Sequence, residues 1–112
     1  MAIKLTWYGH AAWRIETPGG NLLIDPFLTG NPTAPLSADQ TSAEFILVSH
    51  GHGDHLGDTL NIAKRTGALV ISNFEIANYV QAQGCKAHGL HIGGSREFPQ
   101  QFLELHGFLL AA

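Results

Sequence analysis

The sequence is poor in cysteine, in charge and in long apolar runs, and each shortage excludes a class of protein. A single cysteine cannot form an internal disulfide, which argues against a disulfide-stapled secreted domain and favours a reducing cytoplasm. Six Lys and Arg against nine Asp and Glu give a net charge of −3, so we expect no nucleic-acid or membrane-surface binding. The apolar stretches fall short of the roughly 18 residues that a transmembrane helix needs.

Charged residues make up 13% of the chain, about half the roughly 25% usual for soluble domains. Either the surface is unusually neutral, or part of it is covered by something else. The length of 112 residues fits one domain.

The N-terminal part predicts an antiparallel meander. Apolar and polar residues alternate over 3–8, which is typical of a strand with one buried face. Residues 11–17 predict a second strand, and the turn sequence at 18–21 leads to a third at 22–24. Residues 25–42 lack periodicity and predict a long surface loop.

The pattern then changes to alternating strands and helices. The apolar run 45–48 predicts a strand buried on both faces, and Leu56, Leu60 and Ala63 predict a helix that ends at Gly67. A strand is expected at 68–71. Next we expect a helix capped by Ser72 with Glu75 and ending near residue 84, and a further strand at 86–90. This order implies parallel crossovers, whereas the last fifteen residues fit neither period.

Three histidines and one aspartate lie within six positions between the apolar run and the first helix: His50, His52, Asp54 and His55. An extended backbone points residues 50 and 52 to the same side, and the next pair starts a helix. Imidazole and carboxylate are the usual ligands of zinc and neighbouring transition ions. Solvated loop histidines are the simpler alternative, but four such residues at one strand-to-helix junction favour a metal site.

The motif His50-x-His52-x-Asp54-His55 resembles the signature of the metallo-β-lactamase superfamily. More narrowly, the sequence is similar to the uncharacterised metal-dependent hydrolases related to L-ascorbate-6-phosphate lactonase. The similarity covers residues 1–97 and is carried by the segments 7–11, 23–32, 50–58, 63–67, 73–79 and 91–96.

This resemblance implies an α/β fold, namely the N-terminal half of an αββα sandwich whose mixed sheet has an antiparallel start followed by βαβα. It implies one or two zinc ions, or manganese or iron, with His50 and His52 at the first metal and Asp54 and His55 at the second. Asp25 matches an aspartate that orients a ligand histidine; alternatively, it only closes the turn before Pro26. His10 matches a histidine facing the cleft, or is a solvated loop residue.

The implied activity is hydrolysis of an ester, lactone or phosphoester substrate by metal-bound hydroxide, with Asp54 as the catalytic ligand that orients the nucleophile. Cys85 has no expected role. The alternative is a non-catalytic metal-binding or protein-interaction module left by loss of the C-terminal half.

Members of the resembled family are about twice as long, and a further histidine, a bridging aspartate and a last histidine have no counterpart here. Residues 98–112 form an unmatched tail of the kind that a frameshift or truncation produces. His88, His91 and His106 could substitute as ligands. Surface roles are favoured, because no spacing directs the first two toward His50 and the third lies in the unmatched tail. Hydrolysis is therefore expected only if another chain supplies the absent ligands or if this is a partial sequence.

A missing second half also leaves one sheet face without cover. This face would carry apolar side chains from the predicted strands: Ile3, Leu5, Trp7, Trp13 and Phe45. We therefore expect a homo-oligomer, a complementing chain or poor solubility.

Overall fold

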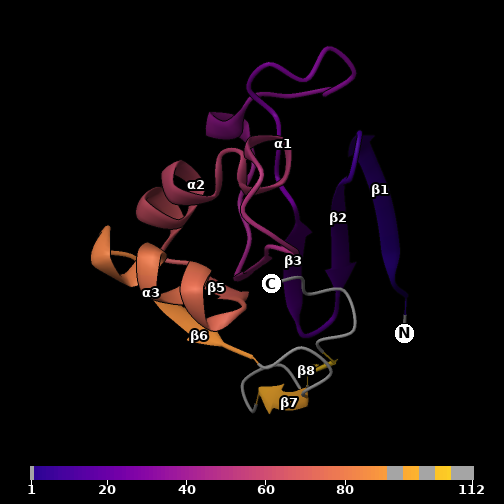
Figure 1. The fold of residues 1–112 in the computed structure, drawn as a ribbon. Helices are drawn as coiled ribbons and strands as arrows, with labels where there is room; N and C mark the ends of the chain where they lie inside the picture. The colour runs from indigo at the N-terminus through magenta and orange to yellow at the C-terminus, as the bar shows by residue number, and fades with distance from the viewer. Residues whose placement is uncertain (1, 91–94, 99–102, 107–112) are drawn as a thin grey trace.

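The computed structural model describes residues 2–90, 95–98 and 103–106. Six strands form one sheet in sequential order: β1 (Lys4–Gly9), β2 (Ala12–Thr17), β3 (Gly20–Ile24), β4 (Phe45–Leu47), β5 (Leu69–Ser72) and β6 (Ala87–Gly89) (Figure 1). The pairs β1–β2 and β2–β3 are antiparallel, and β3 to β6 run parallel. The predicted mixed sheet, with its antiparallel start, is confirmed.

A separate antiparallel pair follows this sheet. It consists of β7 (Ser95–Phe98) and β8 (Leu103–His106). The sequence predicted no strand or helix after residue 90, so β7 and β8 are both additions. In β8 the reason can be seen. Its four residues alternate apolar and polar, but the run is too short for periodicity to identify.

The helix predicted from Leu56 to Gly67 is two helices, α1 (Gly53–Leu56) and α2 (Thr59–Thr66). Gly57 separates them with φ 48°, and a Cβ there would lie 2.6 Å from the Phe27 Cα. The chain breaks here because the loop after β3 crosses at this point, where the Asp58 amide donates to the Pro26 carbonyl. Gly67 ends α2 in the left-handed conformation, as predicted.

The predicted cap of α3 (Phe74–Ala82) is wrong by one residue. Asn73 caps this helix, since its side chain accepts a hydrogen bond from the Ile76 amide at 2.9 Å. Ser72 is instead a buried residue of β5, and its hydroxyl donates to the Val48 carbonyl at 2.7 Å.

Helices α2 and α3 cover one face of the sheet, where Ile62 and Val80 pack with strand residues such as Leu23, Ile46 and Val70. On the other face, four apolar residues at the β1–β2 end are 39–62% exposed: Ile3, Leu5, Trp7 and Trp13. The expectation of an uncovered face is confirmed for these four. It is wrong for Phe45, which is buried with Leu22, Ile71 and Leu90.

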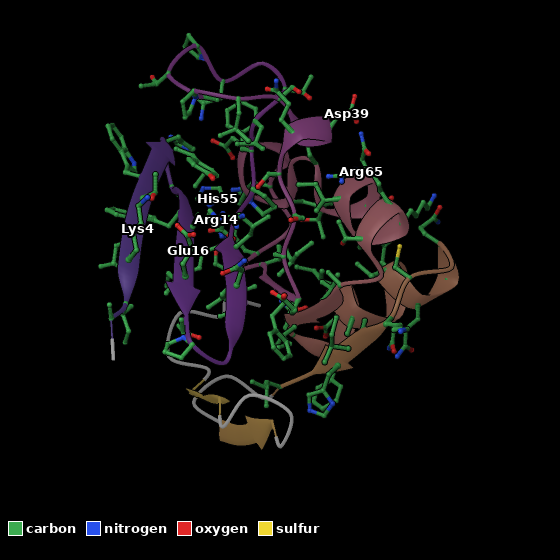
Figure 2. All side chains as sticks on the ribbon, turned by 180° about the vertical axis from the view of Figure 1, so that it is seen from behind. Lys4, Arg14, Glu16, Asp39, His55 and Arg65 are labelled. Atoms are coloured by element: carbon green, nitrogen blue, oxygen red, sulfur yellow. The ribbon has the colours of Figure 1, made fainter. Side chains whose placement is uncertain are left out.

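The long loop between β3 and β4 contains a short 3-10 helix, η1 (Ala38–Gln40), and is held to the sheet and to α2 near its C-terminal end. Arg14 of β2 donates to the Ser42 carbonyl at 2.6 Å, and Arg65 of α2 donates to the carbonyls of Ala38 and Thr41. Figure 2 shows Arg65 beside η1, where Asp39 is labelled. Within the described parts of the chain, no helix combines the length and apolar character needed to cross a bilayer.

Candidate metal centre

The predicted site residues gather where β1, β3 and β4 end. His10 lies in the turn between β1 and β2, Asp25 directly follows β3, and residues 50–55 run from the end of β4 into α1. Because β3 and β4 are parallel, their C-terminal ends lie side by side, and the Asp25 amide donates to the Leu47 carbonyl at 2.8 Å.

Asp25 is the buried centre of a hydrogen-bond network. It is 3% exposed, and its carboxylate accepts bonds from the Ser49 amide at 2.7 Å and from the Ser49 hydroxyl at 2.6 Å. His55 Nδ1 lies 2.9 Å from Asp25 Oδ2. A carboxylate only accepts, so Nδ1 of His55 carries the proton and Nε2 keeps its lone pair. Asp25 therefore does more than close the turn before Pro26.

Ser49 determines the proton position on a second histidine, His50. Its hydroxyl donates to Asp25, so it accepts from His50 Nδ1, which lies 2.9 Å away. The Nε2 atom of His50 is then also left with its lone pair. Sequence reasoning missed Ser49; a hydroxyl residue directly before the first histidine, at the end of a buried strand, was the available signal.

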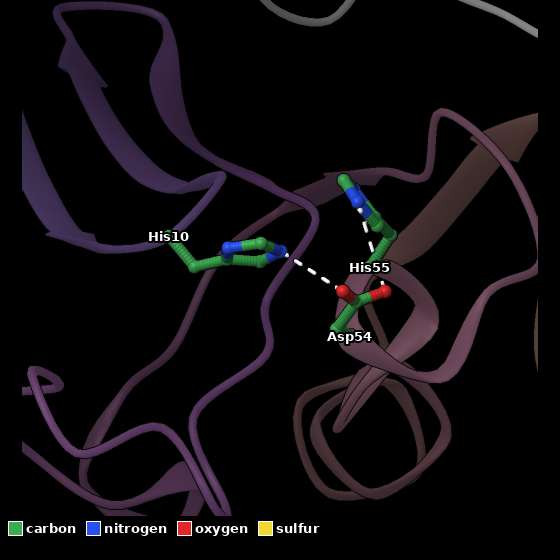
Figure 3. A group of neighbouring side chains, drawn as sticks. All are labelled: His10, Asp54 and His55. Atoms are coloured by element: carbon green, nitrogen blue, oxygen red, sulfur yellow. Dashed lines mark hydrogen bonds and ion pairs between the residues drawn. The ribbon is translucent and has the colours of Figure 1, made fainter.

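His10, Asp54 and His55 form a group whose potential metal-ligand atoms all lie within 4.8 Å of one another (Figure 3). His10 Nε2 is 3.1 Å from Asp54 Oδ2, and His55 Nε2 is 3.7 Å from Asp54 Oδ1. His10 therefore faces the cluster. Its side chain is also 45% exposed in the turn.

His50 and His52 lie beside this group. Their ring centroids are 4.7 Å apart, and the His50 and His55 centroids are 4.0 Å apart. The two imidazoles thus share one side of the chain, as their spacing predicted. Among the described residues, the one group of three closely spaced ligand atoms nevertheless contains His10 and neither of these two histidines.

The electrostatic environment favours the charged form of Asp54. Desolvation raises the pKa of its carboxyl, but the His55 imidazole, a backbone hydrogen bond and His10 lower it more, so the net pKa lies below the usual value. Its side chain is 49% exposed. Asp54 is thus an ionised oxygen donor that a ligand from solvent can reach.

Two site residues adopt backbone conformations that are rare for residues other than glycine. The φ angles are 53° at His10 and 44° at Asp25. Such angles cost about 1–3 kcal/mol and persist where the surroundings impose them. The fold holds both side chains in place at the expense of local backbone strain.

The donor set fits a divalent transition ion. Neutral imidazole nitrogens and an ionised carboxylate are ligands that zinc, manganese and iron accept, and Asp25 fixes the imidazole tautomers as metal ligands require.

The remaining candidate donors lie elsewhere. His88 is in β6, outside the group, and Cys85 is a buried core residue whose thiol contacts the Leu60 carbonyl. His91 lies outside the described residues, and only the backbone of His106 is described.

Comparison with known proteins gives relatives that are named for a metal-dependent activity. A relative from Heliobacterium modesticaldum, named UPF0173 metal-dependent hydrolase, is 57% identical over 97 residues, which is 87% of this chain and 41% of the relative. One of the same name from Carboxydothermus hydrogenoformans is 52% identical over 103 residues, or 92% of this chain and 46% of the relative. The chain therefore spans less than half the length of these relatives.

Among solved structures, Igni18, described as a novel metallo hydrolase from the archaeon Ignicoccus hospitalis, superposes with a TM-score of 0.76 at 35% identity. The superposition covers 84% of this chain and 42% of Igni18. The family model described as Beta-lactamase superfamily domain matches residues 4–103. The chain therefore belongs to the family of beta-lactamase superfamily domains.

Proposed function

We propose that this chain carries the metal-binding half of a hydrolase that acts on a small-molecule ester, lactone or phosphoester. In this proposal His50 and His52 hold one cation and Asp54 and His55 hold another, with zinc as the first choice and manganese or iron as alternatives. The observation that carries it is the buried Asp25 carboxylate, which orients His55 directly and His50 through the Ser49 hydroxyl.

The proposed chemistry divides between the ion and the chain. A bound divalent cation lowers the pKa of a coordinated water and polarises the scissile carbonyl or phosphoryl oxygen. Asp25 and Ser49 keep the protons of His55 and His50 on Nδ1, and Asp54, ionised and half-exposed, would act as the ligand that orients the attacking water. Because water is the nucleophile in this proposal, no serine or cysteine nucleophile is required.

A second candidate is a metal-binding module without turnover. It is favoured by the length of the chain, which spans 41% and 46% of two of its metal-dependent hydrolase relatives, so further ligands in those proteins can lie outside the matched region. In this case the cluster binds metal but lacks part of the catalytic machinery.

Zinc titration by calorimetry, combined with assays on phosphodiesterase and lactone substrates, separates the two candidates. Zinc binding with turnover supports the hydrolase, whereas one bound ion without turnover supports the module. His52→Ala should weaken zinc binding, while His88→Ala, outside the ligand group, serves as the matched control. Failure of the wild-type chain to bind zinc, manganese or iron would overturn both.

We further propose that a complementing polypeptide covers the exposed apolar residues of β1 and β2, and that it corresponds to the region that relatives carry beyond the match. The relatives are more than twice the length of the matched region, which supplies a partner of sufficient size. Co-expression with the C-terminal part of the Heliobacterium relative should give a one-to-one complex in sedimentation. A dimer of this chain alone that excludes the added polypeptide would favour a second copy instead.

We propose a cytoplasmic location, which the single, buried cysteine supports because it forms no internal disulfide. Fractionation of cells expressing a tagged chain tests this, and recovery outside the cytoplasm would contradict it.

A further inference from the structure

We propose that His10 is itself a metal ligand and that it forms, with Asp54 and His55, a three-residue site for a single divalent cation. This rests on the proposed function and deepens it. The motif at residues 50–55 includes Asp54 and His55 but not His10. The resemblance implies only that His10 faces the cleft.

The spacing of the three donors matches coordination to one ion. Two ligands about 2.1 Å from a tetrahedral zinc ion lie about 3.4 Å from each other. The separations observed here, 3.1 Å from His10 Nε2 to Asp54 and 3.7 Å from His55 Nε2 to Asp54, lie on either side of that value. An ion can therefore replace these two contacts with shifts of a few tenths of an ångström, and the ligand atoms of the third pair, His10 and His55, lie within 4.8 Å of each other.

Both histidines turn Nε2 toward Asp54, and a cation would take the place of the proton that His10 Nε2 donates to this carboxylate. The Nδ1 atom of His55 is bonded to Asp25, so Nε2 is the donor that faces Asp54. His10 also turns Nε2 toward the same carboxylate (Figure 3). The two imidazoles thus approach Asp54 with equivalent ring nitrogens, and their ring centroids are 5.2 Å apart.

The position of His10 is imposed by its surroundings. The Trp7 indole donates to the His10 carbonyl at 2.9 Å, and the Phe27 ring lies edge-on to the imidazole with centroids 5.9 Å apart. The preceding Gly9, at φ 96°, packs so closely that a Cβ there would be 2.8 Å from Thr33. The left-handed backbone of this tight turn, which histidine tolerates, fixes the direction in which the imidazole leaves the chain.

The consequence concerns the number of ligands. Catalytic zinc sites normally use three protein ligands and leave one position open. With His10 included, one cation reaches that number from residues of this chain alone, through segments 44 residues apart in the sequence. No donor from another polypeptide is then needed for this ion.

Binding of cadmium, a spectroscopic substitute for zinc, tests the inference on the wild-type chain. We expect coupling between the bound cadmium nucleus and the Nε2 atoms of His10 and His55 in nitrogen-labelled protein. A direct metal bond produces this coupling, whereas a hydrogen bond from His10 to Asp54 does not. Cadmium coupled to other histidines but not to His10 would overturn the inference and leave the proposed function intact.

His10→Asn provides a second measurement, because asparagine tolerates a positive φ but is too short to replace the imidazole. Zinc affinity by calorimetry should fall at least tenfold, while circular dichroism stays that of the wild type. His88→Asn is the matched control and should bind zinc normally. Unchanged zinc affinity in folded His10→Asn would overturn the inference, and absence of zinc binding by the wild type would overturn the proposed function as well.

Discussion

The conservative substitution Asp25→Asn should lower metal affinity strongly while the chain still folds. Asparagine is nearly isosteric with aspartate and also tolerates the φ of 44° found at this position. Its amide nitrogen, however, donates where Oδ2 accepted. His55 Nδ1 and the Ser49 hydroxyl both bond to Oδ2, so both must reverse their roles to keep a partner.

This reversal moves the histidine protons. If His55 accepts at Nδ1, its proton shifts to Nε2, and the lone pair that would bind metal is lost. Ser49 would donate to His50 instead of accepting from it, with the same result at a second ring. Because supporting partners of metal ligands are each worth about 10–100-fold in affinity, we expect a loss at the upper end of that range.

The effect on stability should be smaller for asparagine than for alanine. Asp25→Ala leaves three donors without an acceptor in a buried site, which costs about 3–5 kcal/mol. That is a large fraction of a typical stability of about 5–15 kcal/mol. Asp25→Asn keeps the shape and the bond from the Ser49 amide and should cost about 1–2 kcal/mol.

Urea unfolding without metal and zinc calorimetry measure the two quantities separately. Asp39→Asn, at an exposed position on η1, is the control for removal of a carboxylate and should change neither. Wild-type zinc affinity in folded Asp25→Asn would refute the reasoning that Asp25 sets the histidine tautomers.

Three further predictions follow from the same contacts. Ser49→Ala should lower zinc affinity less than Asp25→Asn in calorimetry, because it removes the hydrogen bond to His50 only. An equal loss would contradict the inference that Asp25 acts on His50 through Ser49 and on His55 directly. Gly57→Ala should cost more than about 2 kcal/mol in urea unfolding, since its Cβ would lie 2.6 Å from the loop backbone, whereas Gly53→Ala meets nothing within 4 Å and should be tolerated. Zinc at 100 times its dissociation constant should add about 2.7 kcal/mol and raise Tm by about 10–20 °C, reversibly with chelator; no shift in a calorimetric scan would exclude binding to the folded state.

Local patterns were sufficient to predict most of the sheet. Alternation over the first strands, the apolar run at 45–48 and the glycine at the end of α2 each act through neighbours in the sequence, and each prediction agrees with the fold. The errors arose where contacts between residues distant in the sequence determine the local structure. The break at Gly57 depends on packing against Phe27, and Ser72 is unavailable as a cap because it pairs with Val48.

The same distinction applies to the site. The spacing of His50 to His55 is visible in the sequence, and the resemblance supplied His10 and Asp25. The sequence could not show which atoms these residues present, because that depends on Ser49 and on the meeting of β3 with β4. Neighbouring ligands are visible as a motif, whereas the bonds that orient them appear only in three dimensions.

The metal cluster and the uncovered apolar face should behave as independent properties. The cluster sits at the C-terminal ends of β3 and β4, whereas Leu5 lies in β1, 61% exposed and opposite Ile15 of β2. Leu5→Glu should therefore reduce association in sedimentation and leave zinc affinity unchanged. Asp25→Asn should lower zinc affinity and leave association unchanged, because residues that share no partners contribute additively. If Leu5→Glu weakened zinc binding as much as Asp25→Asn, covering this face would be a condition for forming the site.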